Sequence, residues 1–147
     1  MITSMKTSIA ALLTLLVIAT LAAITPTQAE DAIRVVEQPT GAVVYTASFT
    51  GAGGHVTTGA VTIETKGGKT IVTLGEDFSL DGAPDPKLAF GKNGYAKDTI
   101  FTKLKNHKGA QVYEVPGTIN VADYNELWLW CEKFNVPLGL AKLTKSS

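Results

Sequence analysis

Glycine residues divide the chain from Gly41 onward into short segments rich in valine, isoleucine, threonine and aromatic residues. Runs of roughly four to eight such residues between turn-forming residues are typical of β-strands. A helix needs a longer run with apolar residues every three or four positions, and no segment after Gly41 has that spacing over more than a turn or two. The sequence therefore predicts an all-β fold of short antiparallel strands.

Two of the expected strands form a hairpin. Ala60 to Glu64 and Thr70 to Leu74 flank the pair Gly67-Gly68, and glycine tolerates the positive φ angles that a tight hairpin turn requires. Ahead of this hairpin, Gly41 to Thr50 alternates between two faces, as a half-buried strand should. One of these faces carries Val43, Tyr45, Ala47 and Phe49.

Another strand is expected at Gln111 to Val115, because Pro116 cannot donate a hydrogen bond to a neighbouring strand. A charged turn at residues 106–109 is expected to join it to Ile100 to Leu104.

The most apolar segment is Glu126 to Phe134. Alternate residues of a strand point to opposite sides of the sheet. One side carries Leu127, Leu129 and Cys131, and the other carries Trp128, Trp130 and Glu132. Because both sides are largely apolar, this strand is expected at the centre of a covered sheet. We therefore expect a single domain over residues 41–147, an antiparallel two-sheet β-sandwich.

Residues 1–29 have the layout of a secretory signal peptide. The apolar and small-residue run from Ile9 to Ile24 is shorter than a comfortable membrane span of about 20 residues. Thr27 and Ala29 are small residues at the two positions that signal peptidase reads. Cleavage after Ala29 would leave a short polar lead-in at 30–40 and an exported protein, periplasmic or secreted. The alternative is an uncleaved membrane anchor.

The charge balance argues against nucleic acid as a partner. Loss of the signal peptide, with its single lysine, leaves 12 basic and 13 acidic residues, a formal net charge of −1. Nucleic-acid binding needs clustered lysine and arginine, which this chain lacks. No membrane span follows the signal peptide, so we expect a soluble mature protein.

Cys131 is the only cysteine, so it has no intrachain disulfide partner. It can be buried and inert, paired with another chain, bound to a group, or used chemically. Free cysteine is among the most buried residue types, which favours the first interpretation. Tyr124, Trp128 and Trp130 lie near the thiol in sequence and could pass electrons, although a core role is the commoner one for such aromatics.

Two histidines, His55 and His107, could join Cys131 in a copper site. Such sites place a histidine and a methionine shortly after the cysteine, and residues 132–147 contain neither, so copper is unfavoured and no metal is assigned. The covalent haem signal Cys-x-x-Cys-His is also missing, so any haem would be held non-covalently, for example by the thiolate.

Asp77, Asp81 and Asp85 recur every four residues and carry the oxygen ligands that calcium prefers, but their spacing does not match the helix-loop-helix pattern. Aspartates that bond the backbone of their own turns are the commoner case.

Several short segments follow one another in a recognisable order along the chain. They are Gly53-Gly54-His55, Leu74 to Phe78, Ala83 to Pro86, Tyr113 to Pro116, and Tyr124 to Ala141 with Cys131 inside its aromatic strand. Together they resemble the DM-thirteen electron-transfer domain family, whose members often stand beside DOMON domains.

The resemblance implies a secreted or surface-exposed β-rich domain that takes part in electron transfer. The suggested redox residue of that family is a cysteine, acting as a bare thiol or as the ligand of a group such as haem, and it corresponds to Cys131. No DOMON or cytochrome segment is recognised here, so we expect a separate redox partner protein.

We therefore expect an exported redox or electron-transfer module, rather than a stand-alone enzyme, with Cys131 as its redox residue. The alternative is a non-enzymatic binding module in which Cys131 is only packed and the glycine-rich loops contact a protein or glycan.

Overall fold

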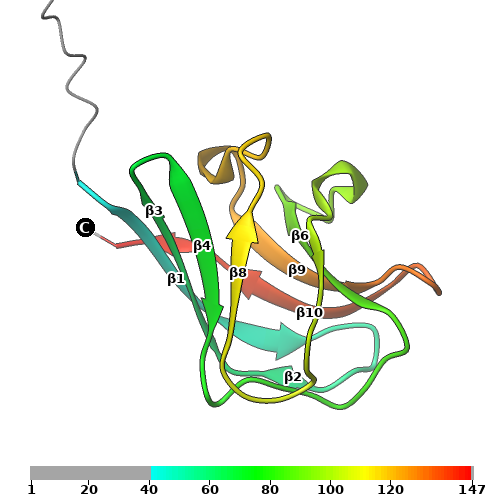
Figure 1. Ribbon diagram of the computed structural model, residues 1–147. Coiled ribbons are helices and arrows are strands. Elements are labelled where there is room, and N and C mark those ends of the chain that lie inside the picture. Colours follow the sequence, from blue (N-terminus) through cyan, green and yellow to red (C-terminus); the bar gives the residue numbers. More distant parts are fainter. Residues whose placement is uncertain (1–40, 147) are drawn as a thin grey trace, which may run out of the picture. The chain divides into compact units, whose positions relative to one another are not determined.

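The structure of the chain is a computed structural model that describes residues 41–146. The expected signal peptide and the lead-in at 30–40 lie outside the described residues. Within the described part, strands wrap around a common interior, as Figure 1 shows. The helical elements there are two 3-10 turns, η3 (Lys97–Thr99) and η4 (Val121–Asp123). The all-β prediction is confirmed, and no helix within residues 41–146 has the length and apolarity needed to cross a bilayer.

Nine strands form one hydrogen-bonded sheet in the order β7-β6-β9-β10-β1-β3-β4-β8, with β11 beside β1. Neighbouring strands are antiparallel. The strands are β1 (Val43–Gly51), β3 (Ala60–Lys66), β4 (Lys69–Leu74), β6 (Pro86–Gly91), β7 (Thr102–Lys103), β8 (Gln111–Val115), β9 (Glu126–Cys131), β10 (Val136–Lys142) and β11 (Thr144–Lys145). A separate two-stranded sheet pairs β2 (Thr57–Thr58) with β5 (Ser79–Leu80).

Strand β1 belongs to both halves of the large sheet. Its first part, as far as Ser48, pairs with β3, and its last part, from Phe49 to Gly51, pairs with β10. The sheet therefore passes through β1 without a break and curls until it is nearly closed. The expected pair of separate sheets is not confirmed, because a strand of this length can bend and change its partner along the way.

The edges of the curl are β7 and β8, which follow each other in the chain. Ile100 to Leu104 was expected as a strand joined by a turn to β8, but only β7 forms there, and it pairs with β6. Side chains of β8 reach across the remaining gap. The hydroxyl of Tyr113 accepts from Lys105 N at 3.0 Å and donates to Gln111 Oε1 at 2.6 Å. That same Oε1 accepts from Asn106 N at 2.9 Å.

The β3–β4 hairpin is confirmed. Gly67 and Gly68 both have positive φ, 57° and 78°, as a type I′ turn requires, and Lys66 pairs with Lys69 at its base. The central position predicted for β9 is also confirmed, since β9 lies between β6 and β10.

The two-stranded sheet caps one end of the curl, where Figure 1 labels β2. Thr57 is 1% exposed, and its hydroxyl donates to Leu138 O at 2.7 Å, where the register of β10 shifts in a bulge. A Cβ at Gly139 would lie 2.9 Å from the Thr57 side chain, so only glycine permits this close approach. This contact holds the cap against β10.

Replacement of Tyr113 by phenylalanine should weaken the closure of the sheet. Lys105 N and Gln111 Oε1 would each lose a buried partner, so we expect the free energy of unfolding to fall by about 1–3 kcal/mol. Urea denaturation measures this. Glu114→Gln, on the exposed side of the same strand, should change stability by less than about 0.5 kcal/mol. Equal stability of Tyr113→Phe and the unmodified protein would show that the hydroxyl does not close the gap.

Candidate functional site

Strand β9 sends its side chains alternately into the core and onto the outer face of the sheet. Leu127 and Leu129 are fully buried and Cys131 is 1% exposed, all three within the hydrophobic core. Trp128 and Trp130 lie on the outer face and are half-buried. The two predicted faces of this strand are therefore both confirmed.

Cys131 is a free thiol at the last position of β9. Its strand neighbours are Pro86, the first residue of β6, and Val136, the first residue of β10. Reactive thiols are partly exposed to solvent, whereas this one is enclosed by the core in the described conformation. Any chemistry at its sulfur therefore requires a local movement at this end of β9.

A backbone hydrogen bond and several ion pairs connect this end of β9 to β6 and β7. The N–H of Glu132 donates to Asp85 O at 3.2 Å, which ties the end of β9 to the residue before β6. Lys87 Nζ lies 3.5 Å from both an Asp85 and a Glu132 carboxylate oxygen, and Lys103 Nζ lies 3.6 Å from Asp85. Because these groups are partly exposed, each ion pair stabilises the closed end by only about 0–1 kcal/mol.

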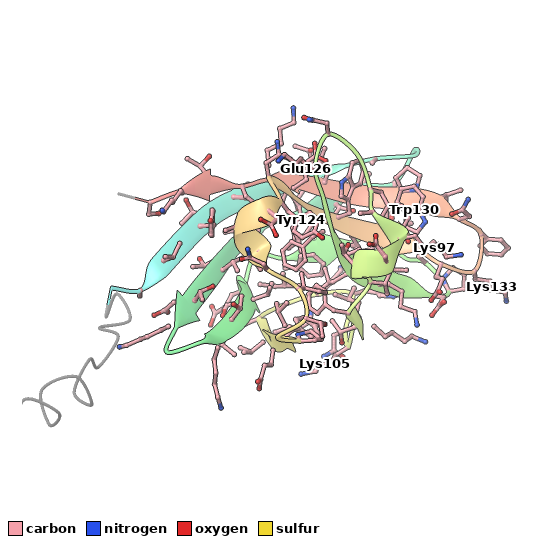
Figure 2. The ribbon with its side chains drawn as sticks, turned by 90° about the horizontal axis from the view of Figure 1, so that it is seen from above. Lys97, Lys105, Tyr124, Glu126, Trp130 and Lys133 are labelled. Carbon is pink, nitrogen blue, oxygen red and sulfur yellow. The ribbon has the colours of Figure 1, made fainter. Side chains whose placement is uncertain are left out.

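The outer face of β9 carries an ordered aromatic cluster, with Glu126 and Trp130 labelled in Figure 2. Tyr95 stacks on Trp130 with ring centroids 3.9 Å apart and planes 2° from parallel. Trp128 meets Trp130 edge to face, with centroids 6.0 Å apart. Glu126 is only 8% exposed, and its Oε2 accepts from Trp128 Nε1 at 3.0 Å and from Gly94 N at 2.8 Å. The buried carboxylate thus fixes both Trp128 and the loop that presents Tyr95.

Gly91 makes room for this cluster. A Cβ at this position would lie 2.6 Å from Trp128 Nε1 and 2.2 Å from Gly94 O, so a side chain would push the indole away.

Burial, followed by the charge of Glu132, raises the pKa of Tyr95. Tyr95 was not predictable as a member of this cluster, because a single tyrosine after an Asn-Gly turn carries no signal of its stacking partner Trp130, which lies far along the chain.

The two histidines lie apart from the core that holds Cys131. His55 Nδ1 is 2.9 Å from Asp81 Oδ1, and Val56 N donates to the other oxygen of Asp81 at 3.0 Å. The Val56 hydrogen bond first, and then that of His55, hold the pKa of Asp81 below its ordinary value. His107 is exposed, and its carbonyl accepts from Leu80 N.

Within residues 41–146, no three His, Cys, Asp or Glu side chains stand close enough together to hold a metal ion. Asp77 and Asp81 bond the backbone, but of segments 17 and 25 residues earlier in the chain rather than of their own turns, as had been expected. Asp77 accepts from Ala60 N at 3.0 and 3.1 Å, and Asp81 accepts from Val56 N. Asp85 instead belongs to the ion pairs beside Cys131.

A pocket of about 410 Å³ opens into the curl beside η4 and the β3–β4 turn. Apolar and hydroxyl side chains line it, including Val43, Tyr45 and Thr70, whereas Cys131 is not part of its wall. Together with the 1% exposure of Cys131, this means that the residues present do not fit a haem ligated by its sulfur.

Conservative replacements of Cys131 should measure how tightly it is packed. Cys131→Ser places a hydroxyl in an apolar core, and we expect a loss of about 1–3 kcal/mol in the free energy of unfolding. Cys131→Ala leaves only a small cavity and should cost about 1 kcal/mol. Thr62→Ser, on the exposed side of β3, is the control. Urea denaturation in which the serine variant equals the unmodified protein would contradict the burial of the thiol.

Comparison with known proteins identifies the family. A search of curated proteins and of solved structures found no significant match. The model of one family, described as Electron transfer DM13, matches residues 48–143, which include β9, Cys131 and the whole aromatic cluster. The chain therefore belongs to the DM13 electron-transfer family.

Proposed function

We propose that this protein is an exported electron-transfer module whose redox group is the Cys131 thiol, exposed by local opening of the turn at residues 132–135. The family description supports electron transfer. The chain has a single cysteine, so no second thiol of its own competes for the role. Export rests on the signal-peptide pattern of residues 1–29.

The position of Cys131 at the end of β9 carries the proposal. Residues 132–135 form the turn that follows at once, and Phe134 within it is 62% exposed. The bonds that close the turn are few and lie near the surface. Asn135 N donates to Glu132 O at 3.3 Å, and Trp130 Nε1 donates to Asn135 Oδ1 at 3.3 Å. Ends of strands open at lower free energy than their centres, so the sulfur can be reached without global unfolding.

The chemistry is thiol–disulfide exchange with a separate protein that carries a disulfide. The opened thiol first loses its proton to water. Its thiolate then attacks one partner sulfur, so a bond forms between Cys131 Sγ and that sulfur while the partner's S–S bond breaks. The departing partner sulfur leaves as a thiolate and takes up a proton. In the resulting mixed disulfide, Cys131 Sγ is oxidised from the thiol to the disulfide level, the departing partner sulfur is reduced to the thiol level, and the partner sulfur bonded to Cys131 keeps its oxidation state.

The alternative is the binding module in which Cys131 is only structural. Its 1% exposure and its place in the hydrophobic core favour this alternative. The two functions differ in one measurable property, namely whether the thiol becomes reachable while the rest of the sheet stays folded.

Labelling of the native thiol with a disulfide reagent such as dithionitrobenzoate tests this property. We expect slow labelling, on the order of 100-fold below the unfolded chain, with a rate that depends only weakly on urea because little surface is exposed. Lys87→Ala, which removes the ion pair to Glu132, should speed labelling several-fold. Lys66→Ala, on the distant β3–β4 turn, should not. A urea dependence equal to that of global unfolding would leave only the structural role.

The mature N-terminus tests export. Expression of the full chain in a bacterium that secretes through signal peptidase should yield a periplasmic or secreted protein that begins at Glu30. Mass spectrometry of the purified protein measures this. Full-length protein retained in the membrane fraction would instead support the uncleaved anchor.

A further inference from the structure

The outer face of β6, β9 and β10 presents an apolar strip over the strand that carries Cys131. Trp130 lies opposite Lys87 on β6 and Pro137 on β10, and Trp128 lies opposite Leu140. Both indoles remain partly exposed, and large aromatic side chains that are partly exposed on a sheet face are typical of protein interfaces.

This strip is ordered before any partner binds. Glu126 fixes the Trp128 indole and the Gly94 backbone, and Tyr95 lies flat on Trp130. Side chains that are already held in place lose little conformational entropy on association. The cluster is therefore suited to act as the centre of a contact surface.

Lysines surround the strip. Lys142 lies opposite Glu126 on β10, Lys97 begins η3 just after the loop of Tyr95, and Lys133 stands in the turn after Cys131. Lys97, Trp130 and Lys133 are labelled in Figure 2. With Lys92, these lysines are exposed, and none of them takes part in the ion pairs found within residues 41–146.

The acidic residues near the strip leave this positive rim in place. Asp85 and Glu132 are paired with the two lysines Lys87 and Lys103, and Glu126 is buried and accepts from Trp128 Nε1. Asp98, inside η3, is an exposed acidic neighbour of Lys97. The rim therefore keeps an excess of positive charge around an apolar centre.

We infer that this face is the docking surface for an electron-carrier protein whose own contact face has an apolar centre and an acidic rim. The inference rests on the proposed electron-transfer function, and the partner is a carrier of low isoelectric point whose two cysteines alternate between disulfide and dithiol. Opposite charges at the rims steer the encounter and set the orientation, and the apolar centres supply contact. A carrier docked here lies beside the turn at residues 132–135, whose opening would make the sulfur on the inner face of β9 reachable.

Nuclear magnetic resonance tests the surface directly, because the only two tryptophans in the chain are Trp128 and Trp130. The ¹⁵N-labelled protein therefore shows two indole N–H signals, both from this face. The probe is an unlabelled, oxidised thioredoxin of low isoelectric point, added to the Cys131→Ala variant so that binding stays non-covalent. We expect both indole signals to shift to saturation, with affinity about tenfold weaker at about 200 mM than at about 20 mM salt.

Charge reversal supplies the matched comparison. The double variant Lys97→Glu/Lys133→Glu should bind about tenfold more weakly, whereas Lys66→Glu/Lys69→Glu, with the same change in net charge on the β3–β4 turn, should bind unchanged. Equal loss in both double variants, tighter binding to a basic carrier, or unmoved indole signals would overturn the inference.

Parallel exchange assays with the unmodified protein separate the two proposals. Docking without thiol exchange would retain this surface and remove the redox role of Cys131. Exchange without any shift of the indole signals would retain the redox role and remove the surface.

Discussion

Strand β9 is hydrogen-bonded on both sides, to β6 and to β10, and this double pairing decides which of its side chains point inward. A shift of one residue would turn the thiol outward and bury the indoles. The register is protected because Leu127 and Leu129 fill the core while Trp128 depends on the space left by Gly91. The pairing of β9 with both neighbours thus places the thiol and the aromatic cluster on opposite faces of the same six residues.

Much of this arrangement was predictable because it depends on local patterns. Alternation in β9 gave the two faces, and the pair Gly67-Gly68 gave the hairpin. Other features depend on partners distant in sequence and have no local signal. The switch of β1 between β3 and β10, the bridge from Tyr113 to Lys105 and the stacking of Tyr95 on Trp130 are of this kind. The depth of Cys131 was equally open, because both faces of its strand are apolar.

If the chain is exported as proposed, Cys131 faces oxidants that cytosolic thiols largely escape. Enclosure of Cys131 in the core protects the sulfur from irreversible oxidation, since susceptibility follows exposure and thiolate character. The ion pairs of Lys87 with Asp85 and Glu132 beside it are partly exposed and therefore weak. Under the proposed function, the same architecture would protect the sulfur while the turn at residues 132–135 is closed and would allow exchange when that turn opens.

Lys105, which lies at the gap between the sheet edges β7 and β8, also affects how these edges can pair with other chains. Lys105 Nζ donates to Val112 O at 2.9 Å, which occupies a main-chain acceptor of β8 with a charged side chain. The facing strand β7 is only two residues long. Unpaired strand edges are templates on which foreign chains assemble into aggregates, and a short edge and a lysine are among the features that prevent this. The gap that leaves the sheet incompletely closed is thus also protected from β-pairing with other chains.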